Sequence, residues 1–585
     1  MGNIKELIEE ELKKVIEEIF GEKPDSFNLT SPPDVGLGDF TVSCFHFVKK
    51  FKENPANIAK KIAAGITTLN IIKNVSASGP YLNIKIKNSV LFRLTCINII
   101  KNGDNYGKID EGNGKKVMIE YLSPNTNKPL HLGHVRNGSL GMAISNILKS
   151  AGNNVIRANL LNDRGAHICK SMLAWQKWGN GQTPETENIK GDHFVGKWYV
   201  RYAKEAELFN HLEEEVQKML QKWENGDPET VQLWDMMNNW VYQGFSETYK
   251  KLGLKFDVFY YESETYKLGK NIVSEGIEKG VFAKDQYGNI VFYLPEKFTG
   301  SKSKEDKKVT VLRSNGTSLY VTQDIATALL KVKEHGLDSS VYVVGSEQIY
   351  HFQCLFEILK SLGYSWADSC YHLSYGMVYL PEGKMKSREG KVVDADDLIA
   401  KVKNLAADEI RVRHPENNLS AEEIERRAEI IGDGAIKFYL LKVKPYQDIN
   451  FNPEESISFD GFTGPYCQYA YARISSILKN ADYKKSESCV PDFSLLGNEE
   501  ELALIQKLIQ FPEELRKAAE EYNPSRIAGY VFSVAKAFNQ FYNRHKVLNA
   551  ENKSLEMARL DLVKSTAVVI KNSLSLLGIN TLEEM

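Results

Sequence analysis

The stretch between residues 116 and 161 has a residue pattern that few folds can accommodate. The run KVMIEYL (116–122) is short and largely apolar, as expected of a strand buried on both faces of a parallel sheet. A turn rich in Pro, Asn and Gly follows, then a helical pattern at 135–150 and a second strand-like run, NVIRANLL, at 154–161. Strand, helix and strand in this order predict a βαβ unit of a doubly wound, Rossmann-type parallel sheet.

The rest of the chain divides into segments that differ in their pattern of apolar and polar residues. Helical patterns, one of them near 41–66, and the alternating run YLNIKI (81–86) predict a small α+β domain at the start. Strand-like runs return at 309–322 and 339–345, and nearly everything beyond about residue 400 has a helical pattern. We therefore predict a multidomain α/β protein: an N-terminal α+β domain (1–112), a Rossmann-type parallel-sheet domain (113–395) with a helical insertion near 190–260, a helical connector (396–430) and a C-terminal α-helical bundle (431–585).

The composition is that of an ordinary globular protein. Apolar residues make up 42% and charged residues 26%, which excludes a mostly disordered chain. No run approaches the roughly 18 apolar residues of a membrane span, and the first residues lack an apolar signal core. The seven cysteines never form a Cys-x-x-Cys pair, which indicates reduced thiols rather than disulfides or a zinc ribbon. We expect a cytoplasmic protein with no membrane contact.

The sharpest motif, SPNTNKPLHLGH (123–134), lies where the first strand of the βαβ unit should hand over to its helix. Nucleotides bind at this edge of such sheets, where a helix N-terminus offers free N–H groups to phosphate. Gly133 allows close approach to the backbone, and His131 and His134 are spaced to share one face and donate hydrogen bonds to phosphate. The alternatives are a His-x-x-His half-site for a metal or two surface histidines.

A second motif, GKMKSREG (383–390), follows about 250 residues later. Its flanking glycines predict a loop, and Lys384, Lys386 and Ser387 suit a polyphosphate. The alternative is a solvated charged face, which is what most charge runs are.

Together the two motifs resemble the HIGH and KMSKS signatures of class I aminoacyl-tRNA synthetases. Further segments resemble the arginyl-tRNA synthetase family in particular, and they cover most of the chain. Those segments are SPNTNKPLHLGHVRN, the run from Leu319 through YVTQDIA, VVGSEQIYHFQ (343–353), HLSYGMVYLPEGKMKSREG (372–390), FDGFTGPYCQYAYARI (459–474) and the ending FYNRHKVL … LGI.

An arginine substrate agrees with the chemistry of these residues. A guanidinium has five donors and a permanent charge, so its site needs acceptors, ideally including a carboxylate. Tyr320 and Asp324 are spaced i, i+4 on one helical face. The alternative makes Asp324 a helix N-cap and Tyr320 a core residue. The resemblance implies that the guanidinium meets Tyr320, Asp324 and Gln348, whereas the α-amino and carboxylate end meets Ser123, Asn125 and His134.

One departure from the general class I pattern concerns the second motif. The fourth position of KMSKS is lysine, and here the series is Lys384, Met385, Lys386, Ser387, Arg388. We hypothesise that Lys128 supplies the missing cation at the ATP phosphates, with Lys386 as its rival. The catalytic and ATP-binding set is then Lys128, His131, Gly133, His134, Lys384, Lys386 and Ser387.

The resemblance implies an arginine–tRNA ligase that activates L-arginine with ATP and Mg²⁺ and passes it to the terminal adenosine of tRNA(Arg). It further implies transfer to the 2′-hydroxyl, activation that requires bound tRNA, and a monomer. No protein-bound metal, zinc, haem or flavin is expected. The alternatives are a class I synthetase of another specificity, disfavoured because an apolar pocket would not need Asp324, and a non-catalytic tRNA-binding paralogue.

The C-terminal helical domain resembles the family's anticodon-binding domain, and the N-terminal domain would touch the tRNA corner. The candidate anticodon contacts, by stacking on aromatics and an arginine plane, are Phe459, Phe462, Tyr466, Tyr471 and Arg473. Some of these aromatics are expected to be core. The net charge of −2 taken alone disfavours a nucleic-acid partner, and from residue 431 onward 18 Lys+Arg face 20 Asp+Glu. Binding of tRNA therefore predicts a spatially segregated positive stripe.

Overall fold

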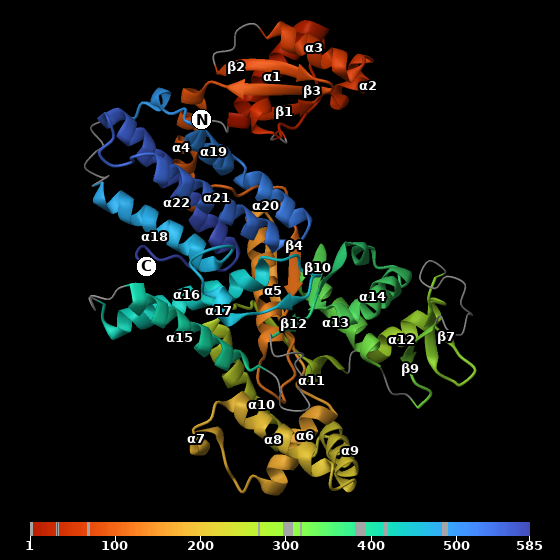
Figure 1. The fold of residues 1–585 in the computed structure, drawn as a ribbon. Coiled ribbons are helices and arrows are strands. Elements are labelled where there is room, and N and C mark those ends of the chain that lie inside the picture. The colour runs from red at the N-terminus through yellow and green to blue at the C-terminus, as the bar shows by residue number, and fades with distance from the viewer. Residues whose placement is uncertain are drawn as a thin grey trace.

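The computed structural model describes residues 4–30, 32, 34–66, 71–266, 269–295, 308–315, 319–380, 393–413, 419–481 and 490–585. The second motif, with Lys384, Lys386 and Ser387, lies outside the described residues. The chain forms an N-terminal domain at one end, a central sheet domain with a helical insertion below it, and a helical bundle beside both (Figure 1).

The central sheet is parallel and five-stranded, as the sequence predicts. Its strand order is β11-β10-β4-β5-β6, so β4 lies in the middle and the chain moves outward in both directions from it. This is the doubly wound arrangement, whose ligand site lies at the carboxyl ends of the strands. The strands are β4 (Lys116–Glu120), β5 (Asn154–Leu161), β6 (Val258–Tyr261), β10 (Ser339–Gly345) and β11 (Cys370–Tyr375).

Three helices cover this sheet and connect its strands. The first, α5 (Leu132–Ser150), is buried along most of its length because it packs on the sheet and is covered in turn by the helical bundle. The other two, α13 (Tyr320–His335) and α14 (Ile349–Ser361), flank β10. The predicted βαβ unit at 116–161 is confirmed to within a few residues.

The insertion is helical, and it occupies the connection between β5 and β6. It consists of α6 (Ala166–Trp178), α7 (Pro184–Glu187), α8 (Gly191–Ala206), α9 (His211–Glu224) and α10 (Pro228–Lys251). The short helices α11 (Glu262–Thr265) and α12 (Gly269–Glu278) follow β6.

The strand expected at 309–322 is only partly correct. The strand β9 (Lys308–Leu312) ends early and joins β7 (Ala283–Lys284) and β8 (Ile290–Tyr293) in a separate antiparallel sheet. From Tyr320 onward the chain is helical. The hydroxyl of Thr322 donates a hydrogen bond to the Val311 carbonyl, and this face of α13 is buried against the small sheet.

In the N-terminal domain, the helical stretch expected near 41–66 is wrong at its start. Residues Phe40–Ser43 form β1, whose apolar and β-branched side chains pair antiparallel with β3 (Tyr81–Ile86) in a β1-β3-β2 sheet. Helix returns only in a 3₁₀ turn, α2 (Val48–Phe51) and α3 (Pro55–Gly65). The remaining elements are α1 (Ile4–Phe20), β2 (Ile72–Ser78) and α4 (Asn88–Asn102).

Beyond residue 395 the described chain is almost entirely helical. Its long helices are α15 (Ala395–Arg413), α16 (Ala421–Leu441), α18 (Gly464–Asn480), α19 (Glu499–Ile509), α20 (Phe511–Glu520), α21 (Pro524–Arg544) and α22 (Lys553–Leu576). Among the described helices, none combines the length and apolar character that a membrane span requires.

Candidate active site

The loop between β4 and α5 has a constrained backbone. Leu122 and Ser123 have φ angles of 79° and 44°, a region that non-glycine residues seldom enter. Two buried amides hold it there: Leu122 N donates to Asn137 Oδ1 at 2.6 Å and Ser123 N donates to Asn159 Oδ1 at 3.1 Å. Such conformations are often found at functional sites, where the surrounding structure pays for the strain.

The two motif histidines cap the N-terminus of α5. His131 is the N-cap residue, and its Nδ1 accepts a hydrogen bond from Gly133 N at 3.2 Å. His134 Nδ1 accepts from His131 N at 3.1 Å, which completes a reciprocal capping box with rings 3.9 Å apart. A neutral imidazole that accepts at Nδ1 carries its proton on Nε2. Both rings therefore keep a free N–H donor at the positive end of the helix.

The charge state of these rings follows from burial. Burial, reinforced by the Lys128 ammonium, lowers the pKa of His131 to about 4 and holds the pKa of His134 well below its usual range. Both imidazoles are thus neutral donors at physiological pH. Burial also lowers the pKa of Lys128.

A cavity of about 280 Å³ lies beside this helix end, between the loop and the insertion. Lys128 and His131 line one wall, and His193 and Lys197 of α8 line the other. The two walls approach closely at Gly196, where a Cβ atom would lie 2.7 Å from Pro129 Cδ. The insertion therefore forms part of the candidate site.

The segment that follows the second motif is fixed to this helix end. Leu132 N donates to Val393 O and Ala395 N donates to Leu130 O, at 3.2 and 2.9 Å. The side chain of Asp394 lies 3.1 Å from His193 Nε2, and the carboxylates of Asp394 and Asp396 raise the pKa of His193 to about 10.

Asp396 is part of a compact cluster with Asp192 and His193 that has the spacing of metal ligands. In the structure the Lys190 ammonium lies inside that cluster, 2.6 Å from Asp396 and 3.2 Å from Asp192. We interpret it as an ion-pair network that joins the insertion to the start of α15.

The segment that precedes the second motif is held by Arg136 of α5, whose side chain is 0% exposed. Its guanidinium donates to the carbonyl oxygens of Gly376 (2.8 Å), Met377 (3.2 Å), Pro445 (2.8 Å) and Gln447 (2.6 Å). The strand β12 (Val378–Tyr379) continues this contact by pairing with β13 (Ile449–Asn450). Arg136 thus joins α5, the approach to the motif and the start of the helical bundle.

The residues expected at the guanidinium lie on the first turns of α13 and in the turn that precedes α14. The N-cap of α13 is Leu319 and Tyr320 is 75% exposed, so the alternative of an Asp324 cap and a Tyr320 core residue is wrong. Asp324 is partly exposed and lies 2.6 Å from His351 Nε2. Gln348 is exposed in the 3₁₀ turn (Ser346–Gln348) after β10.

Two neighbours of Asp324 escape prediction from the sequence. His351 lies in a segment that the sequence flags only through resemblance. Glu262 directly follows β6, and burial raises its pKa to about 7, with Asp163 and Asp324 adding to the shift. Glu262 and Asp324 are 62 residues apart in the chain, so only the order of the strands brings them near each other.

The residues expected at the α-amino and carboxylate end share the β4–α5 loop. Ser123 is half-buried, and its carbonyl accepts from Asn162 Nδ2 at 3.0 Å. Asn125 is exposed and forms an isolated parallel β-bridge with Asn162, and His134 belongs to the capping box of α5. These three groups lie at the carboxyl end of β4, next to β10.

The residues expected at the anticodon fall into two groups. Phe462 and Tyr466 pack on Phe532 inside the bundle. Phe459 and Arg473 belong to a ladder of rings and guanidinium planes: Arg413–Phe459 at 4.1 Å, Arg473–Tyr469 at 4.8 Å and Arg473–Tyr542 at 5.8 Å. Phe459 itself is buried, and Tyr471 is half-buried on α18.

Comparisons with known proteins match the chain in three consecutive parts. Residues 2–86 match the arginyl tRNA synthetase N terminal domain, residues 95–452 match the tRNA synthetases class I (R) catalytic domain, and residues 467–585 match the DALR anticodon binding domain.

Individual relatives match over nearly the whole length. The arginine–tRNA ligase of Treponema denticola is 45% identical over 571 residues, covering 96% of this chain and 95% of that protein. The arginine–tRNA ligase of Flavobacterium psychrophilum is 41% identical over 619 residues, covering all of both chains. Among solved structures, the Thermus thermophilus arginyl-tRNA synthetase matches with a TM-score of 0.83 at 26% identity, covering 100% of both chains.

Proposed function

Because the chain belongs to the arginyl-tRNA synthetase family, we propose that its arginine–tRNA ligase activity takes place where the α5 N-terminus meets the carboxyl ends of β4, β6 and β10. The enzyme activates L-arginine with ATP and transfers it to tRNA. The observation that supports this placement is that the neutral imidazole donors of His131 and His134 lie at the same sheet edge as the carboxylates of Asp324 and Glu262. The first pair suits phosphate and the second suits a guanidinium.

In the arginine subsite, the carboxylates distinguish arginine from amino acids that lack a guanidinium. Asp324 and Glu262 offer acceptors and negative charge to the guanidinium, while Tyr320 and Gln348 add neutral hydrogen-bond partners. An analogue without the guanidinium would leave these groups unpaired, which costs several powers of ten in specificity. Ser123, Asn125 and His134 would hold the α-amino and carboxylate end near the phosphates.

In the ATP subsite, the protein positions the reactants and stabilises charge. The arginine carboxylate attacks the α-phosphorus and pyrophosphate leaves, so negative charge develops on phosphate oxygens. The Nε2–H groups of His131 and His134 donate to those oxygens, and Lys128 with Lys384 supplies positive charge. Carboxylates of Asp394 and Asp397 line the same cavity and offer the oxygen ligands that Mg²⁺ prefers. Mg²⁺ bound with ATP would neutralise part of the phosphate charge.

The helical bundle would read the anticodon through the ladder of rings and guanidinium planes around Arg473 and Phe459. The N-terminal domain would meet the tRNA corner. We further propose that the enzyme acts as a cytoplasmic monomer and transfers arginine to the 2′-hydroxyl.

The decisive assay is ATP–pyrophosphate exchange with tRNA present and each amino acid tested in turn. We expect exchange with arginine alone. Exchange with another amino acid would establish a different specificity, and no exchange with any of them would indicate a non-catalytic paralogue.

Replacing Lys128 with methionine tests the source of the second phosphate-binding cation. We expect the rate of adenylate formation to fall about 100-fold, because a buried ammonium beside the transferred charge stabilises it selectively. Lys386→Met measures the rival residue in the same exchange assay, and Lys177→Met on α6 controls for the loss of one positive charge. A near-normal rate in Lys128→Met would exclude its role.

The raised pKa of Glu262 predicts a pH-dependent KM for arginine. With a pKa of about 7 the carboxylate is mostly ionised at pH 8 and mostly protonated at pH 6. A guanidinium prefers the ionised form, so KM should rise about tenfold from pH 8 to pH 6. In Glu262→Gln the KM should be higher and nearly flat over this range. An unchanged pH slope in that variant would assign the titration to another group.

A further inference from the structure

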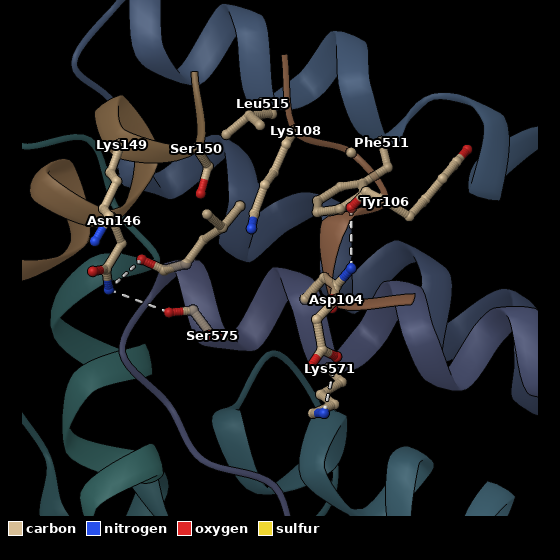
Figure 2. Close-up of a pocket in the computed structure, with 13 residues that line it drawn as sticks. Asp104, Tyr106, Lys108, Asn146, Lys149, Ser150, Phe511, Leu515, Lys571 and Ser575 are labelled. Carbon is tan, nitrogen blue, oxygen red and sulfur yellow. Dashed lines mark hydrogen bonds and ion pairs between the residues drawn. The ribbon is translucent and has the colours of Figure 1, made fainter. Parts of the chain in front are cut away.

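Two cavities lie side by side along the C-terminal half of α5. The first, of about 450 Å³, is enclosed by the connector at 104–108, the last turn of α5, α20 and α22 (Figure 2). The second, of about 440 Å³, is enclosed by α5, the end of α10, α16 and the C-terminal tail. Asn146 and Ser575 line both cavities, so the two hollows form one continuous surface.

This surface is strongly cationic in a chain whose net charge is −2. Only three carboxylates line it, those of Asp104, Glu429 and Asp433. Eight cationic side chains line it, and we call them the basic band: Lys108, Lys149, Arg157, Lys250, Lys251, Lys255, Lys437 and Lys571. Figure 2 shows Lys108, Lys149 and Lys571 around the first hollow.

Half of the basic band is already neutralised within the protein. Arg157, Lys251, Lys437 and Lys571 each lie within 3.0 Å of a carboxylate oxygen. Among the described residues, Lys149, Lys250 and Lys255 have no carboxylate within ion-pair distance, and all three are exposed.

Helix ends account for only part of this charge. Lys149 and Lys250 lie in the last turns of α5 and α10, where cations favour the helix dipole. Lys255 lies outside any helix, as does Lys108, whose ammonium donates a hydrogen bond to the neutral Asn105 Oδ1 at 2.7 Å. The hollowed shape and the extra cations therefore require another explanation.

The basic band leads to the active site. Lys251, at its inner end, lies 2.8 Å from Asp396, the carboxylate that also binds Lys190 beside His193. His193 lines the active-site cavity together with Lys128. The outer end reaches the connector to the N-terminal domain. The helix α5 has 19 residues and is about 28 Å long, with the two imidazoles at its N-terminal end and the first cavity at its C-terminal end.

We propose that the basic band is the surface on which the sugar-phosphate backbone of tRNA lies on its way to the active site. The proposal rests on tRNA being the substrate, and it names the part of the protein that binds it outside the anticodon contacts. Eight cations gathered from segments far apart in the sequence, along two adjoining hollows, fit a run of phosphates rather than one small anion. Charge concentrated here also explains how an acidic protein attracts a polyanion.

The test is a triple variant, Lys149→Gln with Lys250→Gln and Lys255→Gln, in the full-length protein. We measure tRNA dissociation constants by filter binding from 50 to 300 mM KCl, without arginine or ATP. We expect affinity to fall about 10- to 100-fold at low salt and the slope of log K against log salt to decrease by about two to three. In aminoacylation, KM for tRNA should rise while kcat and the KM values for ATP and arginine stay unchanged.

The control removes three exposed lysines that line neither cavity, at Lys284, Lys333 and Lys360, each changed to Gln. Equal losses in both triple variants would show a general charge effect and overturn the proposal. Unchanged tRNA affinity in the first variant would overturn the proposal as well. Normal tRNA binding by a wild-type protein that fails to activate arginine would instead contradict the proposed function.

Discussion

Replacing Asp324 with asparagine should raise KM for arginine about 100-fold while leaving KM for ATP unchanged. The change keeps the shape of the side chain but removes the charge that faces the guanidinium, and truncating one member of a desolvated charge pair costs roughly 3 kcal/mol. The measurement is ATP–pyrophosphate exchange with arginine varied at saturating ATP and tRNA.

The same variant should also discriminate less well between arginine and citrulline, its neutral analogue. Without the carboxylate, the positive charge of arginine no longer adds to its binding free energy. Asp368→Asn, at an exposed ion pair with Lys360, is the control and should behave as wild type. A threefold or smaller rise in KM for Asp324→Asn would mean that Glu262 or another acceptor carries the recognition.

Two substitutions of His131 should separate its structural role from its chemical role. Asparagine places an oxygen where Nδ1 accepts the Gly133 amide, so His131→Asn keeps the helix cap but loses the Nε2 donor. We expect stability within about 0.5 kcal/mol of wild type and an exchange rate 10²- to 10³-fold lower, the typical cost of one donor to developing charge.

His131→Gln should keep the donor and lose the helix cap. The amide nitrogen of glutamine reaches the position of Nε2, but no acceptor remains for the Gly133 amide. For His131→Gln we expect about 1 kcal/mol less stability in thermal unfolding but an exchange rate within tenfold of wild type. If both variants lose activity in proportion to their stability, then His131 serves only as a cap.

The sequence was sufficient to place the first motif in the fold but not to describe the geometry around it. The strands at 116 and 154 and the helix between them follow from local periodicity, and they place the first motif correctly. The Nδ1 capping by His131 and His134 depends on backbone geometry at a helix end, which spacing alone does not reveal. Glu262 and His351 were missed because their relation to Asp324 arises from the order of strands in the sheet.

The two misassigned segments have a common cause. Residues 40–43 and 320–322 lie at boundaries where a strand partner or a packed helix face, rather than local pattern, decides the structure. The basic band could not be located in the sequence either, since it draws its residues from the connector, α5, β5, α10, the loop before β6, α16 and α22. The residues of the second motif remain predictions.

Arg136 limits how this enzyme can be divided into working fragments. Two of the four carbonyls that accept hydrogen bonds from its guanidinium belong to Pro445 and Gln447, far beyond the last strand of the parallel sheet. A fragment cut after that sheet would leave N–H donors of a buried charge without acceptors, at a cost of about 1–3 kcal/mol for each group. The smallest autonomous catalytic piece must therefore include α15, α16 and β13, and recombination between relatives should exchange the chain beyond residue 451 rather than at the edge of the sheet.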